Sequence, residues 1–106
     1  MNLEELLQFI NNEDQRLIQF KNGNNEKERI LSRTVKMTEE LGELCNEVLS
    51  FIGDQRKEKL ERTDKDNLPN EFADVIITTL LLAKTMNVDI VKALEDKIEK
   101  IKKRNY

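Results

Sequence analysis

The stretch Lys36-Met-Thr-Glu-Glu-Leu-Gly-Glu-Leu-Cys-Asn-Glu47 decides how this chain folds. In a helix, where each residue advances by about 100°, its charged residues line one edge and its apolar residues form the adjoining stripe. The edge holds Lys36, Glu40, Glu43 and Glu47, and the stripe holds Met37, Leu41, Leu44 and Val48. Acids that border a buried stripe are not ordinary surface residues. We therefore predict an amphipathic helix with a line of carboxylates beside the core.

A second acidic pair begins the most apolar part of the chain. Glu71 and Asp74 are three residues apart, which places them on one face of a helix. Two such helices can aim four carboxylates at one point, and four converging carboxylates require a cation. Oxygen ligands without nitrogen or sulfur select hard ions, so we expect Mg²⁺, with Mn²⁺ as a substitute. Because Mg²⁺ usually completes its shell with waters and a substrate phosphate, the expected substrate is phosphorylated.

Each acidic group also has a simpler explanation. Acids in the first turn of a helix interact favourably with its dipole, by about 0.3–1 kcal/mol each. The other acids can form a solvated face in a chain of which 37% is charged. Against this, Asp74 precedes Val75 on a helix with no evident solvent face, where an unpaired carboxylate is costly to bury. Lys36 can pair with Glu40, but one lysine does not neutralise four acids.

The composition limits the fold and the class of function. The 106 residues suffice for one domain, residues 1–106, and the low content of aromatic residues, glycine and proline favours helices over a sheet. We therefore expect an all-α fold. A net charge of -3 argues against binding to nucleic acid. The absence of histidine excludes Ser-His and Cys-His catalysis and ordinary zinc sites.

The cysteine content and the hydropathy indicate a cytoplasmic protein. Cys45 has no partner for an internal disulfide, and no leader segment is evident at the N-terminus. The longest apolar segment, residues 75–83, is shorter than the roughly 20 residues of a membrane helix. We therefore expect no contact with a membrane. Cys45 falls on an apolar side of its helix, and we predict that it is a small buried core residue.

Two capping pairs predict the first two helices. A Glu three residues after an Asn allows side chain and backbone to bond reciprocally at a helix start. The pairs are Asn2 with Glu5 and Asn25 with Glu28. Apolar spacing extends the first helix to about residue 20 and the second to about residue 52, and Gly53 ends the second.

Two further helices are predicted after a charged connection. Residues 54–68 have no sustained apolar period, and we expect a mobile connection there. The third helix begins at residues 68–70, with Pro69 in its first turn, and ends near Asn87. Asp89 caps a fourth helix with a basic end.

The third helix should lie in the middle of the fold. It is apolar in nearly every direction, and such a helix needs more cover than three short neighbours give. We therefore expect a four-helix bundle that is completed by homo-oligomerisation, at least as a homodimer.

The acidic residues also carry a resemblance to a known family. The run Glu39-Glu40-Leu41-Gly42-Glu43, followed after 27 intervening residues by Glu71-Phe72-Ala73-Asp74, resembles the EExxE and ExxD signature of the MazG-like nucleotide pyrophosphohydrolases. The similarity continues through Leu80-Leu-Leu-Ala and Asn87-Val-Asp-Ile to a basic last helix. It covers residues 33–104 and is more specific than a lone ExxE motif.

The resemblance implies a MazG-like all-α fold, assembly into dimers or tetramers, and Mg²⁺-dependent hydrolysis. The implied reaction converts a nucleoside triphosphate to the monophosphate and pyrophosphate, as a house-cleaning activity on aberrant or surplus nucleotides. Carried over by position, the implied metal ligands are Glu40, Glu43, Glu71 and Asp74.

Four more residues receive roles in the same comparison. Lys100 and Arg104 match a basic pair that contacts phosphates in similar proteins, and their spacing of four residues places both on one helix face. They are also favourable cations at a helix end. Glu39 belongs to the motif but points further round the helix, so we predict a supporting catalytic role for it. Glu47 lies on the acidic edge, and we predict that it supports the site or orients a water.

Two alternatives remain open. Phosphoribosyl-ATP pyrophosphohydrolases have a similar fold and similar acids, but their usual Glu-Glu-Ala-Ala-Glu type of motif fits less well than residues 39–43. The other alternative is a non-catalytic helical interaction module whose acids bind a structural ion or nothing. Acids at all four ligand positions argue against this module. The preference for base and sugar is not evident from the sequence.

Overall fold

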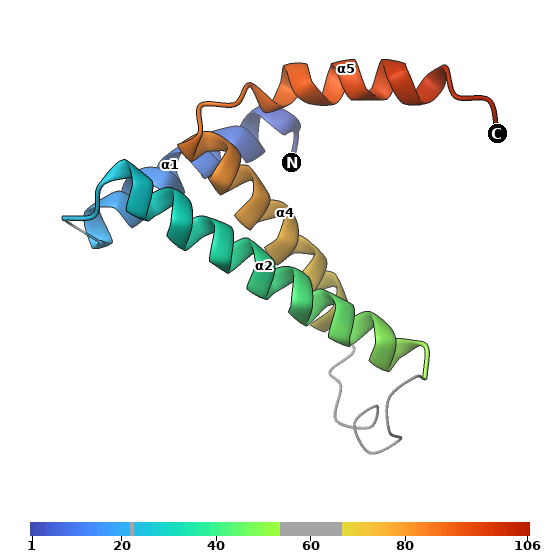
Figure 1. Ribbon diagram of the computed structural model, residues 1–106, viewed down its shortest axis with the longest axis horizontal. Helices are drawn as coiled ribbons and strands as arrows, with labels where there is room; N and C mark the ends of the chain where they lie inside the picture. Colours follow the sequence, from blue (N-terminus) through green and yellow to red (C-terminus); the bar gives the residue numbers. More distant parts are fainter. Residues whose placement is uncertain (22, 54–66) are drawn as a thin grey trace.

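The computed structural model describes residues 1–21, 23–53 and 67–106, and all regular structure in these ranges is helical. The chain forms α1 (Leu3–Phe20), α2 (Glu26–Phe51), α4 (Asn67–Thr85) and α5 (Ile90–Lys102), as Figure 1 shows. The prediction of an all-α fold with four helices is confirmed for these ranges. The predicted charged connection lies outside the described residues, except that its last two residues belong to α4.

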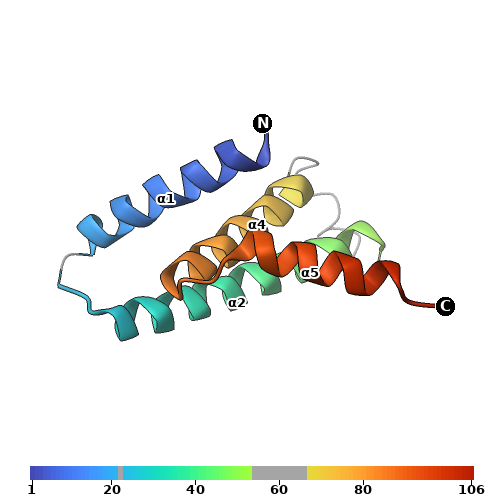
Figure 2. The ribbon, with the colours of Figure 1, turned by 90° about the horizontal axis from the view of Figure 1, so that it is seen from above.

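The helices α2 and α4 form the main packing unit. They run antiparallel and side by side, α1 packs against α4, and α5 extends away from the other three helices (Figures 1 and 2). α4 therefore contacts both α1 and α2, in agreement with its predicted central position. Ile10 of α1 and Leu81 of α4 are the buried apolar side chains of the described chain.

The predicted capping residues begin their helices. The Asn2 Oδ1 accepts a hydrogen bond from the Glu5 backbone N–H at 2.8 Å, and Asn25 with Glu28 forms a complete capping box. Asp89 caps α5 by accepting the backbone N–H three residues later at 3.1 Å. Each bond satisfies a backbone donor that has no partner within the helix. These helix starts are local features, which is why the sequence predicts them.

A buried ion pair joins three helices, and it was not predicted. The Arg33 Nη1 of α2 donates to the Asp14 Oδ1 of α1 at 2.5 Å, and both side chains are buried. On α4, the same guanidinium contacts the Leu81 carbonyl at 3.4 Å and donates to the Thr85 hydroxyl. A buried charge is tolerated when it is paired and hydrogen-bonded, as here. The network fixes how α1, α2 and α4 dock.

The described chain leaves much apolar surface exposed. Its radius of gyration is 16.8 Å, whereas a compact domain of this length has about 13 Å. On α4, Phe72 is 49% and Ile76 53% exposed although the sequence predicts a well-covered helix. The prediction of a buried Cys45 was wrong, because its side chain is exposed. The α2 helix packs against α4 on one face, and its opposite face is exposed among the described residues.

None of the described helices has the length and apolar character needed to cross a membrane.

Candidate metal centre

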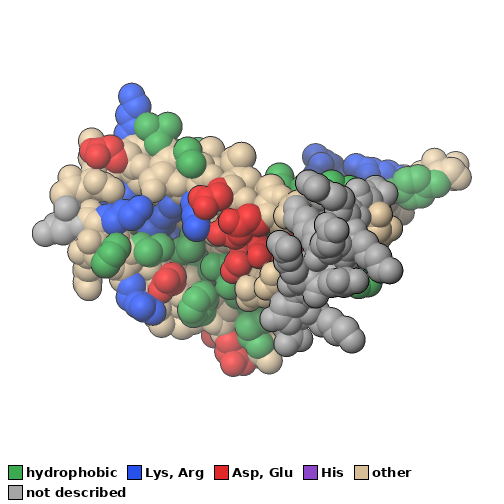
Figure 3. All heavy atoms as spheres, turned by 90° about the horizontal axis from the view of Figure 1, so that it is seen from below, with side chains coloured by type: hydrophobic (Ala, Val, Ile, Leu, Met, Phe, Trp, Pro, Cys, Tyr) green, Lys and Arg blue, Asp and Glu red, His purple; other side chains and the backbone are tan. Residues whose placement is uncertain are grey.

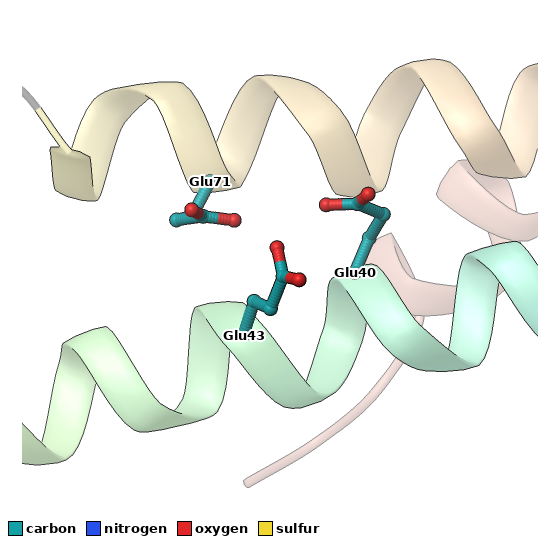
Figure 4. A group of neighbouring side chains, drawn as sticks. All are labelled: Glu40, Glu43 and Glu71. Atoms are coloured by element: carbon teal, nitrogen blue, oxygen red, sulfur yellow. The ribbon is translucent and has the colours of Figure 1, made fainter.

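Three carboxylates from two helices meet between α2 and α4. Oxygen atoms of Glu40, Glu43 and Glu71 lie within 4.8 Å of one another. In Figure 4, Glu40 and Glu43 point from α2 toward α4, and Glu71 points back toward α2. The spacing of three residues puts the two α2 acids on adjacent turns of one face, and the antiparallel packing brings the start of α4 opposite them.

Several oxygens of this acidic group are buried without a partner. Glu40 is 6% exposed, and its Oε1 accepts from the Lys36 Nζ at 3.0 Å. Its other oxygen, Oε2, is buried and has no hydrogen-bond partner among the described residues, and the same holds for the Oε2 atoms of Glu47 and Glu71. Buried polar atoms nearly always have a partner, so orphaned carboxylate oxygens on two members of the group, Glu40 and Glu71, and on the nearby Glu47 indicate a bound proton or cation.

The acids also perturb each other's ionisation. The negative charge of Glu40 is the main cause that raises the pKa of Glu43 above its usual 4.5, and burial and the charge of Glu71 add to it. Burial is the main cause that raises the pKa of Glu71, followed by the charges of Asp74, Glu40 and Glu47. Both shifts oppose ionisation. A divalent cation in their midst would reverse them by favouring the carboxylates.

Asp74 and Glu47 border the three-carboxylate group without belonging to it. Asp74 lies one turn after Glu71 on α4 and is half-buried, and its charge acts on the Glu71 pKa. Its predicted role as a fourth metal ligand stays a prediction. The charge of Glu47 acts on the Glu71 pKa as well, and its predicted supporting role also stays a prediction.

The helix dipole does not explain the acids of α4. As described, α4 begins at Asn67, and its first turn contains no acidic residue. The favourable interaction with a helix N-terminus falls off within that first turn. Glu71 and Asp74 lie beyond it, and so the simplest alternative to a cation site loses its main support.

Lys36 and Glu39 lie at the edge of the acidic group. The predicted ion pair between Lys36 and Glu40 is confirmed, and it raises the pKa of Lys36. The Glu39 Oε1 lies 3.9 Å from the Lys36 Nζ, and the Glu39 side chain is 54% exposed. Glu39 therefore points away from the buried acids, as its phase on the helix predicts.

Lys100 and Arg104 are not brought to the acids of their own chain. Lys100 lies in the last turn of α5 and Arg104 follows the end of that helix. Figure 1 shows α5 extending away from α2 and α4. Among the described residues, no ion pair joins either side chain to an acid of the group.

A cavity of about 420 Å³ adjoins the acidic group on the side of Lys36 and Glu39. Its apolar lining residues are Leu17, Val35 and Leu81, and the other lining residues are polar or charged, Lys21 and Arg29 among them. In Figure 3, a row of Lys and Arg side chains leads to a cluster of acids on one face of the molecule.

The sequence reasoning did not single out Lys21 and Arg29. Each side chain donates a hydrogen bond to a nearby residue. The Lys21 Nζ donates to the Ser32 Oγ at 3.3 Å, and the Arg29 Nη1 donates to the Asn24 carbonyl at 2.8 Å. The available signal was their position on either side of an Asn-rich turn. Only the packing of α1 beside α2 and α4 shows that they line a cavity.

Comparison with known proteins defines the class of protein to which this fold and site belong. The family model described as the MazG-like family matches residues 31–105. The chain therefore belongs to the MazG-like family, whose activity is that of a nucleotide pyrophosphatase-type hydrolase. Searches among curated proteins and among solved structures gave no match.

Proposed function

We propose that this chain is a Mg²⁺-dependent pyrophosphohydrolase that converts a nucleoside triphosphate and water to the monophosphate and pyrophosphate. One observation carries the proposal: three carboxylates from α2 and α4 have oxygens within 4.8 Å of one another. The buried oxygens without partners in the same place support a ligand of positive charge. The donor set consists of carboxylate oxygens, which suits Mg²⁺ and Mn²⁺.

The proposed metal ligands are Glu40, Glu43 and Glu71, with Asp74 as the fourth. A bound Mg²⁺ would neutralise phosphate charge, polarise a phosphoryl oxygen and lower the pKa of a coordinated water. In hydrolysis the water oxygen bonds to the α-phosphorus while the bond from that phosphorus to the β-bridging oxygen breaks, and pyrophosphate leaves. The chain must therefore place the α-phosphate beside the acids and accept a proton from the water.

Glu47 and Lys36 have distinct parts in this proposal. Glu47 has a buried carboxylate oxygen without a partner among the described residues, and it would orient the attacking water and accept its proton. Lys36 holds one oxygen of Glu40 at 3.0 Å and so keeps that carboxylate in place. Glu39, on the exposed side of Lys36, supports the lysine's position.

The nucleotide would enter the cavity beside the acids. A volume of about 420 Å³ lies within the usual range for small-ligand sites, which is roughly 300–1,000 Å³. Its three apolar side chains, Leu17, Val35 and Leu81, suit contact with a nucleobase, and its lysine and arginine side chains suit the charge of the phosphates. We propose a house-cleaning role on aberrant or surplus nucleotides for this activity.

We also propose that the chain works as a homodimer or tetramer in the cytoplasm. The exposed apolar residues and the large radius of gyration support association. Because α5 extends away from the acids of its own chain, Lys100 and Arg104 would bind phosphate at the site of a neighbouring chain. The single cysteine suits a reducing compartment.

The test is pyrophosphate release from a panel of ribo- and deoxyribonucleoside triphosphates in Mg²⁺. Glu43→Gln and Asp74→Asn should abolish release, and Glu95→Gln, which alters an exposed acid of α5, should leave it intact. Mn²⁺ binding, followed by its electron paramagnetic resonance signal, gives a readout without turnover. Mn²⁺ that binds the wild type and both site variants equally would refute the proposed centre. If phosphoribosyl-ATP is hydrolysed and no nucleoside triphosphate is, the proposed substrate is wrong and the chain is a phosphoribosyl-ATP pyrophosphohydrolase.

A further inference from the structure

The outer face of α2 carries a regular apolar stripe that nothing in the described chain covers. Its seven positions alternate in spacing between four and three residues and are Leu31, Val35, Thr38, Gly42, Cys45, Leu49 and Ile52. We call these residues the α2 outer face. All seven are exposed, and the four largest side chains are between 41% and 66% exposed. One of them, Val35, also lines the cavity beside the acids, so the stripe borders that cavity. The stripe lies about half a helical turn away from Arg33 and Glu40, which face the fold.

The spacing of this face is that of a helix–helix contact. Apolar residues repeating every 3.5 positions form a seam that packs against a second helix. The inner face of α2 already packs against α4, so α2 has one apolar face in use and one unused. An apolar seam of 22 residues, 31–52, is long for a helix face that no helix covers in the described part of the chain.

The α2 outer face is complementary to itself. Read from either end, it has two large residues, three small ones and two large ones, with Gly42 at its centre. In an antiparallel pair of such faces, Leu31 lies against Ile52 of the second copy, and Thr38 lies against Cys45 of the second copy. A surface that meets its own copy about a twofold axis must be complementary in this way.

The residues beside the seam also fit an antiparallel pair. On one edge, Thr34, Leu41 and Val48 are uncharged, and Leu41 would meet Leu41 of the second copy. On the other edge, Glu39 would lie opposite Asn46 of the second copy, so that no like charges meet. Burial of Leu41, which is now 49% exposed, would add apolar contact at the centre.

Gly42 gives an independent reason for a close contact at the centre. A Cβ atom placed on this glycine would meet nothing within 4 Å, so the fold of the single chain does not require glycine here. Glycine in the middle of a helix lowers its stability relative to alanine. Its usual benefit is to let another backbone approach closely, and the exposed centre of a self-complementary seam is where such an approach would occur.

The exposed area of the chain exceeds what such an interface needs. The accessible surface is 8410 Å², whereas a compact monomer of this size has about 6,200 Å². The excess is larger than the roughly 800 Å² per partner of a standard interface. We propose that the α2 outer face binds the same face of a second copy, antiparallel, with the twofold axis at Gly42. This deepens the proposed homo-oligomer and does not depend on nucleotide hydrolysis.

The single cysteine of the chain makes the pairing directly testable. In Thr38→Cys, the new thiol should oxidise with Cys45 of the second copy to a covalent dimer at low micromolar protein concentration. The two cysteines of one chain are seven residues, or about 10 Å, apart on the helix and cannot bridge each other. Wild type and the control Lys84→Cys, an exposed position on α4, should stay largely uncrosslinked.

Other crosslinking results would overturn the proposal. A wild type that oxidises readily through Cys45 alone would indicate a parallel pair. Equal crosslinking of Thr38→Cys and Lys84→Cys would show that the face is not an interface. Crosslinking needs neither Mg²⁺ nor nucleotide, so a covalent dimer without hydrolysis would refute the proposed activity and leave the interface standing. Hydrolysis without the crosslink would refute the proposed interface and leave the proposed activity standing.

Gly42→Leu supplies a second measurement. The larger side chain should separate the helices and raise the dimer dissociation constant, measured by analytical ultracentrifugation, by about tenfold to a hundredfold. Helicity by circular dichroism should not fall, because the single chain has open space at this position. An unchanged dissociation constant in a helical variant would overturn the proposed axis.

Discussion

The buried Arg33–Asp14 pair allows a quantitative prediction about stability. Replacing Arg33 with Met removes the only cation within ion-pair distance of Asp14 among the described residues, and Asp14 is 6% exposed. Breaking a buried pair by removing one partner typically costs about 3–5 kcal/mol. The Leu81 carbonyl and the Thr85 hydroxyl each lose a donor as well. Against a typical domain stability of about 5–15 kcal/mol, the loss is large.

A double-mutant cycle separates the interaction between Arg33 and Asp14 from other effects of each substitution on the free energy of unfolding. Arg33→Met and Asp14→Leu each leave one buried charge unpaired, whereas the double variant leaves none, so it should be more stable than either single variant. Urea unfolding of all four proteins at one concentration gives the free energies of unfolding. The wild type and an exposed-site control, Lys27→Met, should not differ. The buried pair would not have the predicted importance if both single variants lost less than about 1 kcal/mol in free energy of unfolding, or if the loss in the double variant equalled the sum of the two single losses.

Three further predictions concern the acidic group. Because the pKa values of Glu43 and Glu71 are raised in the folded chain, the stability that protonation of these groups contributes is fully present below their usual pKa of 4.5 and is lost as the pH rises through the folded-state pKa. Without metal, the melting temperature should fall from pH 5 to pH 7, and Mg²⁺ should restore it at pH 7; a rise with pH in EDTA would contradict this sign. Glu43→Gln should raise the melting temperature in EDTA, by removing like-charge repulsion, and should abolish the gain from Mg²⁺. The Glu43→Gln variant and a double variant with Lys100→Gln and Arg104→Gln should each be inactive alone. When the two proteins are mixed, part of the pyrophosphate release should return, because one chain supplies the acids and the other the basic pair. If mixed oligomers form and no activity returns, the basic pair acts on the acids of its own chain.

The sequence predicted the elements well because their signals are local. Each capping bond joins residues three apart, so an Asn or Asp before a helical pattern is sufficient to locate the start. Apolar periodicity likewise predicts that α2 ends near Gly53, where the structure has a φ of +86° that favours glycine. The start of α4 lies slightly earlier than the predicted range, within the usual scatter of helix ends.

The candidate site was predicted only in part. Spacing placed Glu40 and Glu43 on one face of a helix and Glu71 and Asp74 on one face of another, and the family motif implied that all four are metal ligands. That Glu71 meets the two α2 acids depends on the antiparallel packing of α2 and α4. The cavity beside the acids also includes residues of α1, and no local pattern indicates where that helix lies.

The sequence by itself determined the helices, their capped starts, the acidic edge of α2 and the family. These properties depend on residues at most a few positions apart, or on a motif that can be read directly. The tertiary structure alone decided that Arg33 pairs with Asp14, 19 residues earlier, and with Thr85, 52 residues later. It also decided that Cys45 is exposed, because helical phase identifies apolar faces but not which of two faces the fold will cover. Long-range packing sets these contacts.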